Sequence, residues 1–112
     1  FKKPLSAEFE DGKILDFYSH KPLSEGEISI DHVIPWSYLY SDDIWNLVFT
    51  SKSNNSRKSN ATPDQAAIAS LKRRNEKLGR LLSGSKFGED LEQASRLDLV
   101  DRYYLALTRS YL

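Results

Sequence analysis

The stretch ISIDHVIP at residues 28–35 constrains the fold most tightly, because an alternating strand pattern in it ends abruptly at a proline. Isoleucines alternate with polar residues, and an aspartate and a histidine, Asp31 and His32, come next. Pro35 has no amide hydrogen to donate to a strand ladder, so the strand stops before it. The stretch predicts a short strand that carries an acid and a histidine at its end.

A second strand and a polar helix are predicted shortly afterwards. Residues 47–50 (LVFT) are β-branched, aromatic or aliphatic, as is typical of a strand. Residues 51–59 (SKSNNSRKS) predict a short helix, with a cap at Thr50 or Ser51. A hairpin with a helix packed across it would bring together the polar side chains at the ends of these elements. Those side chains are Asp31, His32, Asn46 and Asn55.

This set of side chains suits phosphodiester hydrolysis. A carboxylate and an amide oxygen, from Asp31 and Asn55, are hard ligands of the kind that Mg²⁺ or Mn²⁺ prefers. An imidazole is the side chain whose ordinary pKa, about 6.5, best suits a general base near neutral pH, and His32 adjoins the carboxylate. Such a base needs a third group to orient it, and Asn46 has a side-chain and a backbone oxygen for this purpose.

The segments DHVIPWS and WNLVFTSKSNNSRKSN resemble the HNH nucleases, with their ββα-metal motif. They are most similar to the HNH domain of CRISPR RNA-guided DNA nucleases and related zinc-free enzymes. The likeness covers residues 16–63 and implies an α+β fold: a ββα core followed by a helical extension over 63–112.

The resemblance also implies roles for individual residues. Asp31 and Asn55 would bind Mg²⁺ or Mn²⁺, His32 would be the general base, and Asn46 would support it. Lys58 would lie near phosphate. Asn54 and Asn60 compete with Asn55 for the ligand role, and the N-x-x-K spacing favours Asn55.

The chain departs from many HNH proteins at the positions of their structural zinc. Asp16 and Ser19 stand where one cysteine pair would be, and Ser51 and Asn54 stand where the other would be. Such ligands do not replace four thiolates on zinc. We therefore predict no structural zinc, with helix packing stabilising the hairpin instead.

Positive charge is concentrated after the motif, although the sixteen basic and sixteen acidic residues of the whole chain cancel. Lys52, Arg57 and Lys58 belong to the predicted polar helix and are expected to contact phosphates without reading sequence. Arg73, Lys77 and Arg80 form a stripe on the next predicted helix. The stripe fits a solvated helix face as well as it fits a nucleic-acid contact.

Further helices are predicted toward the end of the chain. One begins with Thr62 as its N-cap and Pro63 in its first position, and it ends near residues 83–85. A last helical region starts from a cap at Ser95. In the first third of the chain, residues 11–12 (Asp-Gly) indicate a hairpin turn.

Several polar and aromatic residues are given ordinary structural roles. We expect Asp42 and Asp43 to be turn residues and His20 to lie in a loop. The aromatic side chains near the motif are expected to pack against the protein rather than stack on bases. They are Trp36, Tyr38 and Trp45.

The length and composition fit one soluble domain over residues 1–112, with 39% hydrophobic and 29% charged residues. No segment is apolar enough to span a membrane and none resembles a targeting peptide, so we expect a cytoplasmic protein. The first residue is Phe1 rather than methionine, which indicates a piece of a longer protein with further domains.

The function predicted from these features is metal-dependent cleavage of DNA. The motif grips phosphates and so does not separate DNA from RNA. The alternative is a non-catalytic HNH-like module that binds nucleic acid or another protein domain.

Overall fold

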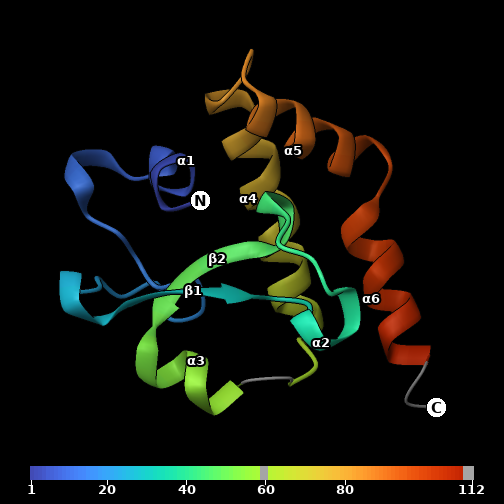
Figure 1. Cartoon of the computed structure of the whole chain (residues 1–112), viewed down its shortest axis with the longest axis horizontal. Helices are drawn as coiled ribbons and strands as arrows, with labels where there is room; N and C mark the ends of the chain where they lie inside the picture. The colour runs from blue at the N-terminus through green and yellow to red at the C-terminus, as the bar shows by residue number, and fades with distance from the viewer. Residues whose placement is uncertain (59–60, 110–112) are drawn as a thin grey trace.

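An antiparallel hairpin forms the centre of the computed structural model. The structure describes residues 1–58 and 61–109, except for the side chains of residues 11, 57 and 58. Strand β1 (Ile28–His32) pairs with β2 (Leu47–Ser51), and His32 lies opposite Leu47 at the end of β1 (Figure 1). Helix α3 (Lys52–Lys58) follows β2 directly and packs against both strands. The α+β fold, with a ββα core and helices after it, is confirmed.

The remaining helices surround this hairpin. Three longer ones form the second half of the chain: α4 (Gln65–Leu81), α5 (Lys86–Arg96) and α6 (Leu99–Arg109). In Figure 1, α4 passes behind the hairpin, and α5 and α6 continue along the top and right. The short helices are α1 (Lys2–Leu5) and α2 (Trp36–Leu39), and single 3₁₀ turns occur at Ser6–Glu8, Glu10–Gly12, Glu25–Glu27 and Ile44–Asn46. None of the helices in the described ranges is long and apolar enough to cross a membrane.

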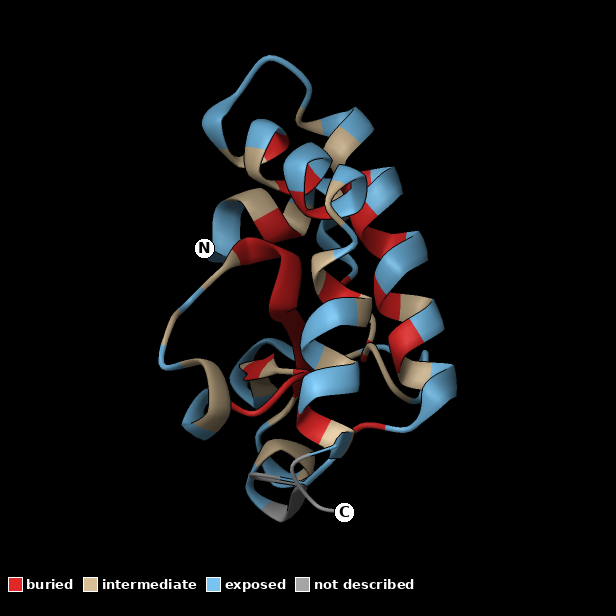
Figure 2. Cartoon of the chain, turned by 90° about the vertical axis from the view of Figure 1, so that its right-hand side faces the viewer, coloured by how far each residue is buried: buried red, intermediate tan, exposed pale blue. Residues whose placement is uncertain are grey.

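One hydrophobic core joins the hairpin to the helices. Leu47, Val48 and Phe49 of β2 are almost fully buried, as are Leu71 and Leu78 of α4. Figure 2 shows buried residues on the inward sides of the helices and exposed residues on their outward sides. The predicted apolar stripe of α4 therefore packs into the same core as the hairpin.

A buried arginine fixes the position of α4 along the start of β2. The guanidinium of Arg74 donates to the carbonyl oxygens of Leu47, at 2.6 Å, and Ile44, at 3.1 Å. Burial lowers the pKa of Arg74 to about 10, and the negative charge of Glu8 acts in the opposite direction. The amide of Asn75 donates to the carbonyl of Trp45 at 2.8 Å. These bonds tie α4 to carbonyl oxygens at the start of β2, where the oxygen of Ile44 also accepts from the amide of Leu47.

Two sequence-based boundaries were wrong. Residues 10–12 form a 3₁₀ turn in which Gly12 has a positive φ of 68°, and no hairpin forms there. The predicted N-cap at Thr62 is displaced to Asp64, whose carboxylate accepts a hydrogen bond from the amide of Ala67 at 2.7 Å. The side chain of Asp64 accepts from the amide three residues later, and aspartate is a stronger N-cap than threonine.

Helix α5 was missed, because its cap lies in the SGS sequence that we interpreted only as the end of α4. The hydroxyl of Ser85 accepts from the amide of Gly88 at 3.1 Å and begins α5. Gly88 permits this start, since a Cβ there would lie 2.1 Å from the carbonyl oxygen of Leu82. Ser95, the predicted cap of the last helix, lies inside α5, and α6 instead begins after Asp98, which has a φ of 52°.

The arginine anchor gives a prediction about stability. We expect Arg74→Lys to lower the free energy of unfolding by about 2 kcal/mol, because one ammonium group does not span both carbonyls. Urea denaturation measures the change. Arg73→Lys, one residue away on the exposed side of α4, is the control and should change stability by no more than about 0.5 kcal/mol. Equal effects of the two substitutions would contradict the anchoring role.

Candidate active site

The carboxylate of Asp31 lies on the face of β1 that also carries Ser29, because side chains two residues apart in a strand share a face. Asp31 is buried, and its Oδ2 accepts a hydrogen bond from the hydroxyl of Tyr18 at 2.6 Å. Burial and the negative charge of Asp31 raise the pKa of Tyr18. The tyrosine therefore stays protonated and acts as a permanent donor that orients the carboxylate.

Asn55 extends from α3 to the same face of β1. Its amide nitrogen donates to the hydroxyl of Ser29 at 2.8 Å and contacts the carbonyl oxygen of Ile30 at 3.5 Å. Both bonds use the nitrogen, so within the part of the chain that the structure describes, the amide oxygen is the atom that can meet a ligand. A carboxylate and an amide oxygen on one face suit a hard divalent cation, which retains waters and substrate oxygens as its other ligands.

His32 ends β1, and its ring is held by an acid that the sequence analysis placed in a turn. The ring nitrogen Nε2 lies 2.6 Å from Oδ1 of Asp42. The His32 side chain is 24% exposed and that of Asp42 is 59% exposed, so the pair lies at the surface. An imidazole in this position is open to water and to a substrate phosphate.

Asn46 is fully buried and binds the backbone that follows His32. Its amide group accepts from the nitrogen of Ile34 at 2.8 Å and donates to the oxygen of the same residue at 2.9 Å. Its backbone oxygen accepts from the amide of Val33 at 3.0 Å. The side-chain bonds of Asn46 thus hold the segment next to the histidine, and the ring itself is bound by Asp42. A contribution of Asn46 to catalysis remains a prediction.

The four expected residues form two groups rather than one cluster of contacts. Asp31 and Asn55 share a strand face, whereas His32 and Asn46 use their hydrogen bonds at the end of the hairpin. Sequence reasoning missed two partners of these groups, Tyr18 and Asp42. Tyr18 lies between Asp16 and Ser19, the positions compared above with a cysteine pair, and it was given no role. Asp42 belongs to an acidic pair and was predicted only to be a turn residue.

The competing ligand Asn54 faces elsewhere. Its amide nitrogen donates to the hydroxyl of Thr50 at 2.9 Å, toward the turn that contains Asp16. Asn60, the other competitor, lies outside the described residues. The contacts of Asn55 with β1 are therefore consistent with the register chosen from the sequence.

The cationic residues are divided between two regions. Lys52 is exposed at the start of α3, and the side chains of Arg57 and Lys58 lie outside the description. Arg73 and Lys77 are exposed on α4, where they line a cavity of about 590 Å³ together with Glu8 and other residues of the N-terminal segment. A role in nucleic-acid binding remains a prediction for all five.

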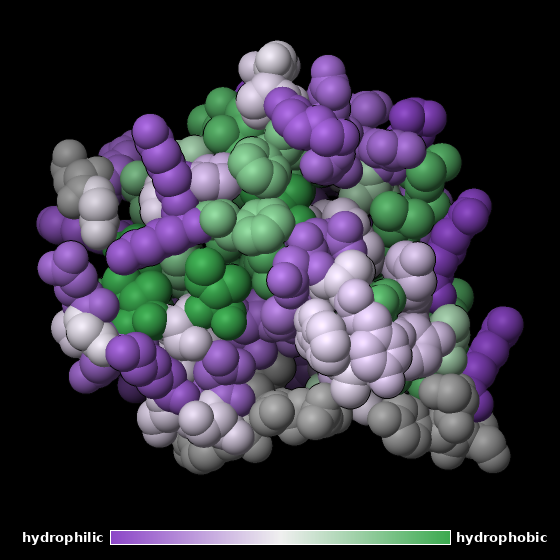
Figure 3. Space-filling view, viewed as in Figure 1, coloured by the Kyte–Doolittle hydropathy of each residue, from purple (hydrophilic) through white to green (hydrophobic). Residues whose placement is uncertain are grey.

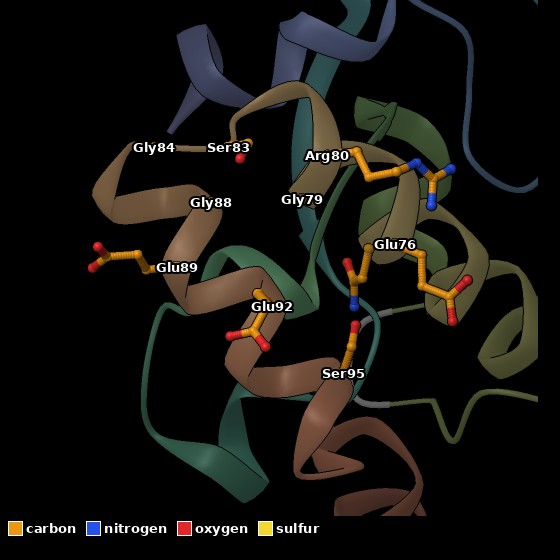
Figure 4. A pocket seen from close by; sticks show the side chains of 10 residues that line it. Glu76, Gly79, Arg80, Ser83, Gly84, Gly88, Glu89, Glu92 and Ser95 are labelled. Atoms are coloured by element: carbon orange, nitrogen blue, oxygen red, sulfur yellow. The ribbon is translucent and has the colours of Figure 1, made fainter.

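A second cavity, of about 420 Å³, lies between α4 and α5, and His32 is not among its lining residues (Figure 4). Glu76, Arg80, Glu89 and Glu92 surround it. Its acidic rim opposes phosphate binding, so it does not extend the candidate site.

The aromatic residues near the motif differ in exposure. Trp45 is buried and stacks on Tyr103, with ring centroids 5.7 Å apart. Trp36 is 47% exposed and forms an edge-to-face pair with Tyr40, which is 70% exposed. Figure 3 shows side chains of intermediate hydropathy gathered over α2. Trp45 and the partly buried Tyr38 pack in or against the core, as predicted, whereas Trp36 packs on Tyr40 at the rim.

A buried polar network occupies the positions that hold zinc in other HNH proteins. Oδ1 of Asp16 accepts from Thr50 Oγ1 at 2.9 Å, and Oδ2 accepts from Ser19 Oγ at 2.9 Å. Asn54 donates to the same threonine, and its own amide donates to Ser51 Oγ at 3.0 Å. All four positions that correspond to zinc ligands thus take part in hydrogen bonds that tie the N-terminal turn to β2 and α3.

Within the described ranges, no group of three or more histidine, cysteine or acidic residues is arranged to hold a metal. The pair of Asp31 and Asn55 contains only one such residue. It would therefore depend on water and substrate for the remaining ligands, as Mg²⁺ sites commonly do.

The polar network gives a prediction about metal and stability. We expect Asp16→Asn to lower the free energy of unfolding by about 1–3 kcal/mol, because an amide nitrogen would face a hydroxyl donor, that of the buried Thr50 or of Ser19. Asp90→Asn, on the surface of α5, should have little effect. Treatment of the native chain with EDTA should leave its thermal midpoint unchanged. A large decrease with EDTA would instead indicate a structural metal.

Comparison with known proteins supports the identity of this segment. Residues 16–64 match a family model described as HNH endonuclease. The match begins at the turn of Asp16 and ends after α3, so it includes both strands and the proposed ligands. No curated protein matches the chain. The match supports an HNH domain in residues 16–64, and the family suggests a nuclease or another nucleic-acid-related function.

Proposed function

We propose that the chain is a metal-dependent endonuclease that hydrolyses phosphodiester bonds in DNA. The observation that carries this proposal is the position of Asp31 and Asn55 on one face of β1, directly before an accessible histidine. These residues lie inside the segment that matches the HNH family.

His32 is the proposed general base. It removes a proton from a water molecule while the water oxygen forms a bond to phosphorus. The bond from phosphorus to the leaving oxygen then breaks, and that oxygen takes up a proton from solvent. An imidazole is suited to this step near neutral pH.

Asp31 and Asn55 are the proposed ligands of one Mg²⁺ or Mn²⁺ ion. When bound, the ion neutralises negative charge on the phosphate and the leaving oxygen. Tyr18 orients the carboxylate through its hydroxyl. Fixing the carboxylate in this way reduces the reorganisation needed when a ligand binds.

The substrate is held mainly by its phosphates. Lys52, Arg57 and Lys58 belong to α3, the helix that carries Asn55, and they would position the duplex without reading its sequence. Arg73 and Lys77 are the more distant candidates. A single site in each chain makes a nick in one strand the natural product.

The likeness to the HNH domains of CRISPR nucleases gives the biological setting. We infer that the chain acts in the cytoplasm as the nuclease part of a longer protein. Other domains of that protein would supply the recognition of a DNA sequence, because the candidate site contains phosphate-binding rather than base-reading groups.

Nicking of supercoiled plasmid tests the proposal. We expect Mg²⁺- or Mn²⁺-dependent nicking by the chain, and His32→Asn should reduce the rate roughly 100-fold or more through loss of the base. His20→Asn is the matched control, because His20 is an exposed loop histidine with a φ of 63°, which asparagine tolerates. It should retain the wild-type rate.

Equal nicking by the wild type and His32→Asn would contradict the assignment of the base. If neither protein nicks the plasmid while both bind duplex DNA with a steep salt dependence, the chain is instead a non-catalytic binding module.

A further inference from the structure

The contact between His32 and Asp42 determines which ring nitrogen carries the proton in the neutral imidazole. An ionised carboxylate only accepts hydrogen bonds, so Nε2 must carry the hydrogen in the 2.6 Å contact with Asp42. The other nitrogen, Nδ1, then has the lone pair that can accept a proton. The ring is thus arranged with one nitrogen facing an acid and the other available as a base.

His32 belongs to the hairpin, and Asp42 lies two residues before the 3₁₀ turn Ile44–Asn46. His32 is paired with Leu47 in the hairpin. Asp42 precedes Asp43, whose backbone oxygen accepts from the amide of Asn46 at 2.9 Å. The buried 3₁₀ turn Ile44–Asn46 thus anchors the residue that follows Asp42.

The chain between the two residues turns back sharply to allow the contact. Tyr40 ends α2 in a left-handed conformation, with φ 55° and ψ 32°. A non-glycine residue in this region is uncommon, and here it directs the chain back toward the histidine. Asp43 does not compete for the ring, because its carboxylate accepts from the hydroxyl of Ser41 at 2.6 Å.

We propose that Asp42 is the positioning residue of the active site, which fixes the ring of His32 so that Nδ1 faces the attacking water. This inference rests on the proposed nuclease function. The pair is exposed, so its ion-pair energy is small in water. Its effect is to select one ring orientation and one tautomer, as the acid does in other acid-histidine pairs.

Nitrogen-15 NMR of the histidine rings tests the positioning without any use of activity. At a pH above the ordinary imidazole pKa of about 6.5, the full chain should show His32 with its hydrogen on Nε2. Asp42→Asn should shift His32 toward a mixture of tautomers, because an amide can donate to Nε2 as well as accept from it. Asp43→Asn removes the same charge one residue away and should leave the spectrum of His32 unchanged.

Plasmid nicking by the same variants tests the consequence. We expect Asp42→Asn to reduce kcat roughly 10- to 100-fold, a part of the contribution of a general base, with KM for DNA unchanged. Asp42→Glu should restore part of the rate, and Asp43→Asn should match the wild type. A change in KM alone would indicate a role in DNA binding and would overturn the proposal.

The two measurements separate this inference from the proposed function. An unchanged His32 tautomer in Asp42→Asn overturns the positioning role, whatever the activity. An altered tautomer with full nicking activity also overturns it. If the wild type does not nick DNA, the nuclease proposal fails, while the NMR result still decides whether Asp42 sets the ring.

Discussion

The buried amide of Asn46 is the contact on which the arrangement of the site depends. The side-chain amide of Asn46 bonds to the backbone nitrogen and oxygen of Ile34. The backbone oxygen of Asn46 accepts from the amide of Val33, and its backbone amide donates to the oxygen of Asp43. Val33 and Ile34 follow His32, and Asp43 follows Asp42. Loss of the side-chain amide would leave two buried backbone groups without partners, which is costly in a protein interior. The middle asparagine of the motif thus has a structural reason to be there: it brings an acid and a histidine together.

A second constraint is the attachment of the N-terminal turn, where related domains use zinc. Here Asp16, Thr50 and Asn54 form a connected set of buried hydrogen bonds, with Ser19 at its edge. The same turn carries Tyr18, which reaches Asp31. We expect stability and function to be linked here, since the turn held by this network also carries the hydroxyl donor to the proposed ligand Asp31. The sequence analysis attributed this stabilisation to helix packing alone. Packing by α4 is present, but the polar network contributes beside it.

The order of strand, strand and helix could be predicted from the sequence. Pro35 ends the alternating pattern of the first strand, and the polar run after β2 ends the apolar pattern of the second. The choice of Asn55 is consistent with the structure for a similar reason, since spacing along a helix determines which face a side chain occupies. Helix α5 and the partnership of His32 with Asp42 could not be predicted in this way. The first depends on a serine cap inside a glycine-containing turn, and the second on a left-handed residue, Tyr40, that turns the loop back. Both depend on tertiary contacts of short polar segments, whose sequences have only weak preferences for one backbone conformation.

The cation site proposed for Asp31 and Asn55 is tested most directly by paramagnetic broadening by Mn²⁺. Trace Mn²⁺ added to the nitrogen-15-labelled chain should broaden the NMR signals of residues 29–32 and the side-chain amide of Asn55 first. The acidic surface of α5, at Glu89 and Glu92, should remain sharp at the same concentration. Broadening that begins on α5 and leaves Asn55 unchanged would contradict the account.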